Sequence, residues 1–275
     1  MGAKLIHIFR NTPIGRESLL QSAYFCKQAD ATPVVYIPRH TKFLMYFEND
    51  VVQVDLDSSY LKAPDSAESR AAELLFEQGM EADFFKPKNF TASTLPDIPT
   101  HFDFMCCPRT ISDLSAKIGL GYIGPRVRRI LNEAYFPVLL TSGVYKPWKR
   151  IAVLFGGSAN ALNALKLGLR LRRTSGLPLE LYTHREGKSE EDYRSIMRKA
   201  HLEDDFERHG DGWHFFEDGP IEESLYEIPH GALVVAGAFR HGLIKDMVFG
   251  STVEKIQSVL PNNLLVVGPK YTASI

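Results

Sequence analysis

Glycines and hydroxyls gather near the C-terminal end of the chain with a spacing that suits an anion. The apolar run Ala232–Ala236 ends at Gly237, and about a dozen residues later a predicted helix opens with Gly250, Ser251 and Thr252. Glycine lets a backbone approach a ligand closely, and a helix start presents unpaired N–H groups and a positive dipole end. The segment therefore predicts an anion site of the kind that holds nucleotide phosphates.

A second group of small residues follows another apolar run. Gly156, Gly157 and Ser158 come after the predicted strand at 151–155 and open the next predicted helix. Two interpretations stay open: a second contact to the same ligand, or a strand-to-helix turn in which Ser158 only caps the helix. Arg240, within the C-terminal loop, either fills the phosphate site or pairs with a phosphate.

Other candidate residues favour structural roles. Cys106 and Cys107 are predicted to be buried, and the three cysteines of the chain have no zinc-type spacing. The letters G-x-G-x-x-G at 119–124 follow a polar segment instead of a strand, which argues against a dinucleotide fingerprint. A basic cluster, 126–129, is predicted as a solvated helix face.

Composition limits the classes of partner. The 275 residues carry 32 basic and 33 acidic side chains, so no general charge attracts nucleic acid or an acidic membrane. No apolar stretch approaches the length of a membrane span, and the N-terminus lacks the features of a signal peptide. The sequence predicts a cytoplasmic protein without a nucleic-acid, membrane or metal partner.

The sequence consists of two halves that repeat one pattern of apolar and polar segments. The segment 4–12 matches 150–158: a basic residue, an apolar run, a phenylalanine and a small polar loop before an amphipathic helix. Gly124 precedes the apolar segment at Pro137 by thirteen residues, and Gly250 precedes Asn263 by the same number. Strands that alternate with helices indicate parallel sheets. We therefore expect two tandem, doubly wound α/β domains with mainly parallel five-stranded sheets, at 1–143 and 147–275.

The middle of each half is less regular. In the first, 51–56 alternates like a strand, 66–79 reads as a helix, and the proline-rich segment 84–100 is predicted as loop. In the second, the pattern predicts a helix, a strand and a short helix, at 189–201, 213–216 and 221–226.

The C-terminal loop resembles the signature of the universal stress protein (UspA) family, Gly-two residues-Gly-nine residues-Gly-Ser/Thr. Gly237, Gly250 and Ser251 stand at matching positions, whereas Arg240 replaces the middle glycine and Gly242 is a displaced one. The second half resembles a universal stress protein domain over its full length, and the first half resembles a degenerate copy without a recognisable phosphate loop.

The resemblance implies the adenine nucleotide alpha hydrolase-like fold and a non-catalytic role in stress response. It implies ATP or another adenine nucleotide as the ligand of the second domain. The implied site consists of Gly156, Gly157, Ser158, Gly237, Arg240, Gly242, Gly250, Ser251 and Thr252. The aspartate that ends the first strand in nucleotide-binding members is replaced by Gly156 here and by Arg10 in the first half, which weakens the expected binding.

The two domains are predicted to pack on each other through their last strands, 137–140 and 264–267, because these are apolar segments and an exposed apolar sheet edge needs cover. A homodimer and a protein partner that the sequence does not identify are further expectations. Two other classes stay open at this point: a nucleotide-handling α/β enzyme, for which no lysine-bearing phosphate loop or acidic metal pair is present, and a dimerisation module that binds no ligand.

Overall fold

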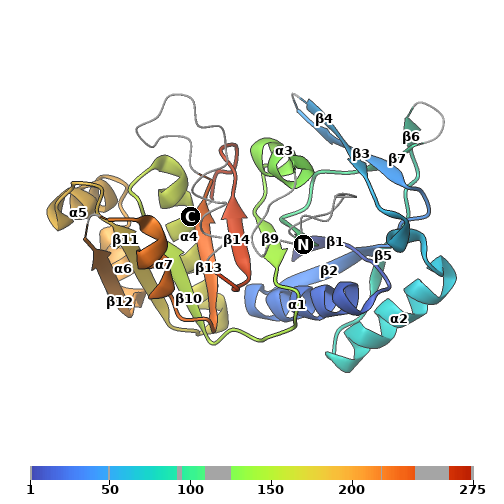
Figure 1. Ribbon diagram of the computed structural model, residues 1–275, viewed down its shortest axis with the longest axis horizontal. Helices are drawn as coiled ribbons and strands as arrows, with labels where there is room; N and C mark the ends of the chain where they lie inside the picture. Colours follow the sequence, from blue (N-terminus) through green and yellow to red (C-terminus); the bar gives the residue numbers. More distant parts are fainter. Residues whose placement is uncertain are drawn as a thin grey trace. The chain divides into compact units, whose positions relative to one another are not determined.

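The computed structural model describes residues 2–48, 50–91, 95–108, 125–217, 219–238 and 260–273. The chain folds as two compact units that meet in sequence between Pro147 and Trp148. We call residues up to 147 the first unit and those from 148 the second unit. Each unit contains a five-stranded parallel sheet with helices packed on it (Figure 1).

The first unit is built on a sheet with the order β9-β8-β1-β2-β5. Its strands are β1 (Ala3–Ile8), β2 (Ala31–Tyr36), β5 (Asp83–Phe85), β8 (Phe104–Pro108) and β9 (Val138–Thr141). Its helices are α1 (Pro13–Ala29), α2 (Pro64–Glu77) and α3 (Pro125–Glu133), with a 3-10 turn, η1 (Ser58–Leu61).

The first unit also carries a second sheet of four short strands, in the order β4-β3-β7-β6. They are β3 (Lys42–Phe47), β4 (Asp50–Asp55), β6 (Phe90–Thr91) and β7 (Leu95–Ile98). The prediction that 84–100 is loop was therefore wrong, because this segment contains β6, β7 and the end of β5. Prolines remove hydrogen-bond donors locally, but β7 still pairs through Asp97 and Ile98 with β3.

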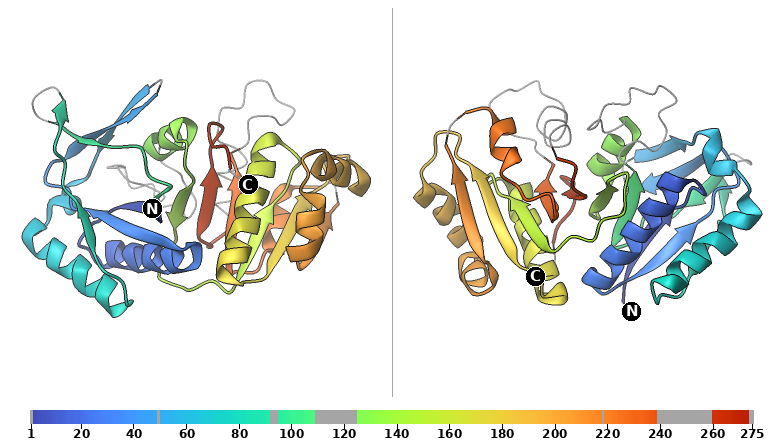
Figure 2. Two further views of the ribbon diagram at one scale, coloured as in Figure 1. Left: turned by 180° about the vertical axis from the view of Figure 1, so that it is seen from behind. Right: turned by 60° about the horizontal axis from the view of Figure 1, so that its bottom comes forward.

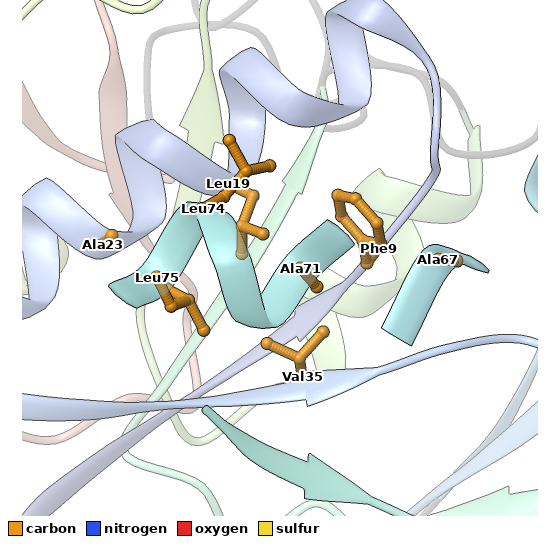
Figure 3. Close-up of a cluster of buried hydrophobic side chains, with 8 residues drawn as sticks. All are labelled: Phe9, Leu19, Ala23, Val35, Ala67, Ala71, Leu74 and Leu75. Atoms are coloured by element: carbon orange, nitrogen blue, oxygen red, sulfur yellow. The ribbon is translucent and has the colours of Figure 1, made fainter. Parts of the chain in front are cut away.

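Helix α1 shows why these residues form this element. Thr12 is the N-cap and accepts a hydrogen bond from the Gly15 N–H, Pro13 occupies the first turn, and Asp30 ends the helix in the left-handed conformation. The buried side of the helix packs with α2 over β1 and β2 around Phe9, and Figure 3 shows this cluster. Its members are Phe9, Leu19, Ala23, Val35, Ala67, Ala71, Leu74 and Leu75.

The basic cluster of α3 lies on an exposed to partly exposed face of the helix, and two of its arginines form ion pairs that the sequence did not indicate. Arg126 pairs with Asp55, and Arg129 pairs with Asp50 at 2.7 Å, so both tie α3 to β4. Burial acts to raise the pKa of Asp55, but hydrogen bonds from Gln53 and Arg126 together with nearby positive charge hold it below its usual value. The arginines therefore stabilise the added sheet of the first unit.

The second unit has a sheet with the order β12-β11-β10-β13-β14. Its strands are β10 (Arg150–Leu154), β11 (Leu179–His184), β12 (Gly212–Phe216), β13 (Ala232–Gly237) and β14 (Leu264–Val267). Its helices are α4 (Ala159–Ser175), α5 (Glu190–Lys199), α6 (Glu203–His209) and α7 (Ile221–Tyr226). Within this unit α7 lies in front of the sheet in Figure 1, and α4 lies in front when the unit is seen from behind in Figure 2.

The core of the second unit forms between the sheet and α4 to α6. The Trp213 ring meets Phe155 and Phe206 edge-on, with centroids 5.8 and 5.7 Å apart. Its indole N–H donates to the Thr183 hydroxyl at 2.9 Å, so the polar end of the ring is satisfied. The single buried side chain of α6, Phe206, fixes that short helix to the core.

The α/β class with parallel five-stranded sheets is confirmed. The domain limits at 143 and 147 and the pairing of the domains through their last strands stay predictions. The G-x-G-x-x-G letters at 119–124 lie outside the described residues. Among the helices that the structure describes, none combines the length and apolar character needed to cross a membrane.

Candidate functional site

The candidate site lies in the second unit, at the carboxyl end of β10. The Phe155 N–H donates to the Tyr182 carbonyl at 2.9 Å, and the chain then turns through Gly156 and Gly157 into α4. Gly157 has a φ of +74°, and a Cβ atom there would lie 2.9 Å from the Cδ1 atom of Ile196. Glycine suits this position because the left-handed backbone strains other residues, and a side chain would also have to displace the end of Ile196 in α5.

Ser158 caps the helix that follows. Its backbone is extended, and its hydroxyl accepts a hydrogen bond from the Ala161 N–H at 3.2 Å. This geometry supports the interpretation of Gly157 and Ser158 as a strand-to-helix turn. Gly156 is partly exposed, and as a glycine it has no side chain that could cover the end of β10.

Gly237 ends the neighbouring strand and lies against the first turn of α4. A Cβ atom at this position would lie 2.6 Å from the carbonyl carbon of Asn160. The Asn160 side-chain amide donates to the Ala238 carbonyl, which ties the chain leaving β13 to the same turn. The structure therefore brings Gly237 and the Gly156–Ser158 turn together at the start of α4.

The remaining predicted ligands lie outside the described residues. These are Arg240, Gly242, Gly250, Ser251 and Thr252. Their assignment to the site stays a prediction from sequence.

The equivalent place in the first unit, at the end of β1, is filled by a side chain. The Phe9 N–H donates to the Tyr36 carbonyl at 2.9 Å, as Phe155 does to Tyr182, so Arg10 is the counterpart of Gly156. The Arg10 guanidinium lies 3.4 Å from a carboxylate oxygen of Asp57 and 5.2 Å from the centre of the Tyr60 ring. An ion pair and an aromatic ring thus hold Arg10 at this strand end.

Thr12 repeats the role of Ser158. It accepts from the Gly15 N–H at 3.2 Å, three residues into the helix, just as Ser158 accepts from Ala161. The two units share the strand-to-helix turn and differ in what stands at the strand end.

Titratable and nucleophilic side chains of the described residues are mostly structural. Burial lowers the pKa of His7 to about 3, which keeps its ring neutral. Cys26, Cys106 and Cys107 are free and buried, and burial raises the pKa of the Cys106 thiol to about 12. Among the residues that the structure describes, no cluster of three His, Cys, Asp or Glu side chains could hold a metal ion.

Sequence reasoning missed two features of the first unit. One is the Arg10–Asp57 pair, whose members are 47 residues apart in the chain. The other is a hollow beside β2 and β5. The aromatic residues of the proline-rich segment 84–100 were a signal for it, but the prediction of this segment as loop gave them no structural role.

Comparison with known proteins finds likeness in structure alone. No protein-family model matches the chain, and no curated protein matches it in sequence. A universal stress protein from Archaeoglobus fulgidus DSM 4304 superposes with a TM-score of 0.64 at 15% identity, over 96% of this chain and 98% of that one.

Two further solved structures are similar. A candidate universal stress protein from Pseudomonas aeruginosa UCBPP-PA14 gives a TM-score of 0.57 at 14% identity, covering 98% of this chain and 94% of that one. The cytoplasmic domain of a prokaryotic cation chloride cotransporter gives 0.51 at 10% identity, covering 97% and 95%. These likenesses show that the chain has the fold of the universal stress proteins.

Proposed function

We propose that this protein is a universal stress protein-like regulatory protein whose second unit binds ATP or another adenine nucleotide. The fold shared with the Archaeoglobus fulgidus universal stress protein supports the class. The observation that carries the assignment to one unit is the packing of Gly237 against the first turn of α4, the helix that the Gly156–Ser158 turn opens. Parallel α/β sheets bind ligands beyond the carboxyl ends of their strands, where this meeting occurs.

The proposed contacts divide between the described turn and the loop after β13. Gly156 and the start of α4 lie beside the sugar or base, and the N–H groups and hydroxyls of Gly250, Ser251 and Thr252 hold the phosphates. Arg240 pairs with a phosphate in this proposal, which compensates for the glycine that the family pattern has there. Binding is expected to be weaker than in proteins that keep an aspartate at the position of Gly156.

Calorimetry with ATP and ADP tests the site, with a matched pair of variants. Gly250→Val places a branched side chain where the backbone must approach phosphate, so binding should be lost. Gly124→Val changes the glycine at the equivalent offset in the first half and should leave binding intact. Equal effects of the two changes would show that the site lies elsewhere.

A dimerisation module without ligand is the second candidate, and one observation favours it. Gly157, Ser158 and Gly237 each have a packing or capping role that needs no ligand. If wild-type protein gives no heat with ATP and sediments as a dimer, this candidate holds. Restored affinity in Gly156→Asp combined with Arg240→Gly would then identify a site lost from a binding ancestor.

A regulatory role is favoured over catalysis, and the proposed setting is the cytoplasm. The three buried free thiols suit a reducing compartment. Turnover of ATP in the presence of magnesium, lost in Gly250→Val, would instead support a nucleotide-handling enzyme. The first half is proposed to be a degenerate domain of the same family, which regulates or stabilises the second.

A further inference from the structure

A hollow of about 340 Å³ lies in the first unit, where β2 and β5 end beside the added sheet. Its volume is in the range of small-molecule sites. The wall is drawn from four places in the chain: the end of β2, the start of α2, β5 with the residues after it, and the short strands β6 and β7. All of these belong to the first unit, so the hollow is distinct from the proposed nucleotide site.

Aromatic rings form much of the wall. Tyr36 and Phe85 meet edge-on with centroids 6.1 Å apart, and His40 and Phe90 meet edge-on at 5.9 Å. Tyr36 is almost fully buried and supports the Phe85 ring from the core. The more exposed rings of Phe85 and Phe90 offer flat apolar surfaces, which suit a planar ligand that can pack face-on or edge-on against them.

The charged residues at the hollow are mostly basic. Arg39, His40 and Lys86 line it together with a single carboxylate, Glu68. Lys86 contacts Glu68 at 3.4 Å, and Arg39 contacts Asp65 at 3.2 Å, with both side chains of the latter pair exposed. Exposed ion pairs contribute little free energy, so either cation can turn to a bound anion at small cost.

The described residues of the second unit lack the elements that form this wall. Its chain passes from β11 to β12 through α5 and α6, whereas the first unit places β3, β4 and α2 between β2 and β5. A four-stranded sheet accompanies the main sheet in the described part of the first unit only. The hollow therefore depends on elements that the first unit has added to the common fold.

We propose that this hollow binds a small planar aromatic acid, an aromatic ring that carries a carboxylate or a phosphate. The rings of Phe85 and Phe90 contact the flat part of the ligand, and Arg39 and Lys86 bind its anionic group. Both features are needed in one molecule, because a simple anion would leave the apolar rings uncovered and a neutral ring would give Arg39 and Lys86 no charge to bind.

Calorimetry with three probes tests the ligand chemistry on the full chain. The probes are 2-naphthoate, neutral 2-naphthamide of nearly the same shape, and cyclohexanecarboxylate, which is an acid without an aromatic ring. We expect 2-naphthoate to bind at least about tenfold more tightly than either analogue, because only it engages the rings and the cations together. Absence of binding by 2-naphthoate, or equal binding of all three probes, would overturn the proposal.

A matched pair of lysine variants tests the location. Lys86→Met removes the cation and keeps the aliphatic stem, and it should weaken 2-naphthoate about tenfold while leaving 2-naphthamide unchanged. Lys88→Met, two residues away and outside the hollow, should change neither. Equal affinity of the two variants for 2-naphthoate would contradict the site. Because both lysines are exposed, neither change should impair folding.

The same variants separate this site from the nucleotide site. Gly250→Val should leave 2-naphthoate binding unchanged, and Lys86→Met should leave ATP binding unchanged. If Gly250→Val abolishes 2-naphthoate binding, the aromatic acid occupies the second unit and the proposal for the first unit fails. Amide signals of 84–90 that shift on titration with 2-naphthoate, while those of 154–160 do not, are the expected NMR result.

Discussion

The two units form the same strand-to-helix turn, but they differ in the residue that follows the first strand. In the second unit the first strand ends at Gly156 and Gly157, and Gly237 lies against the helix start. In the first unit Arg10 ends the strand and is held by Asp57 and Tyr60. The backbone hydrogen bond before the turn and the hydroxyl cap after it are the same in both. The same backbone arrangement therefore leaves the strand end of the second unit without a side chain, whereas the Arg10 side chain lies at the strand end of the first unit.

The contrast extends into the packing of the first helix on the sheet. In the first unit the His7 ring contacts the Ser22 hydroxyl at 3.1 Å inside the core. The equivalent pair in the second unit is Val153 and Gly168, where a Cβ atom on the glycine would lie 2.6 Å from the valine.

A second pair of positions shows the same exchange. Ser18 and Thr141 share a hydrogen bond of 2.9 Å in the first unit, and their counterparts in the second are the buried Ala164 and Val267. Polar contacts thus replace apolar ones at matching places, and the two units should respond differently to acid.

Lowering the pH should produce the largest difference in stability between the two units. The pKa of His7 is about 3 in the folded protein and 6.5 when unperturbed, because burial penalises the charged ring. The unfolded chain therefore binds the proton more readily between these pH values. Stability from this group is complete above pH 6.5 and falls by about 1.4 kcal/mol for each pH unit toward 3.

Urea unfolding between pH 7 and 4 measures this slope for the first unit. His7→Val combined with Ser22→Gly copies the pair found in the second unit and should flatten the slope. His230→Gln, at an exposed histidine, is the matched control. A slope that is unchanged in the double variant would show that other groups cause the acid response.

Close packing at the end of β13 should give the next largest effect. Gly237→Ala places a methyl group within 2.6 Å of the Asn160 backbone and should cost about 1–3 kcal/mol. Gly231→Ala is the control, because a Cβ atom there meets nothing within 4 Å. Thermal unfolding of the two variants checks this, and equal stability would mean that β13 and α4 can separate easily.

The arginine that fills the first strand end should contribute less. Arg10→Leu removes a half-buried ion pair and a cation–π contact and should cost about 1–2 kcal/mol. Arg70→Leu breaks the more exposed pair with Glu73 at 2.8 Å and should cost under about 0.5 kcal/mol. If both changes cost the same in denaturant titrations, Arg10 would have no special role at this strand end.

The parallel sheets could be predicted from sequence because their strands are short apolar runs next to amphipathic helices. Leu264–Val267 and Ala232–Gly237 are buried throughout, and both were recognisable. The short helix α6 escaped because Phe206 is its single buried residue, which leaves no periodicity to read. The strands β6 and β7 escaped because, among the described strands, β6 pairs only with β7, and β7 joins the sheet through β3, which lies about 50 residues earlier in the chain.

The candidate site was predictable in part for a similar reason. The glycines of the turn and of β13 are marked in the sequence, since a positive φ and a close approach both demand glycine. The partner of Arg10 and the hollow beside β5 were not, because each joins residues that only the fold brings together. A sequence therefore shows where the backbone requires glycine more readily than it shows which distant side chains will be in contact.

Photolabelling with 8-azido-ATP can show whether nucleotide binds in the second unit and not in the first. Irradiated wild-type protein is digested, and the labelled peptides are identified by mass spectrometry with and without excess ATP. We expect labelled peptides from within 148–275 whose yield falls when ATP is added. Labelled peptides from within 1–147, or labelling that ATP does not reduce, would contradict this expectation.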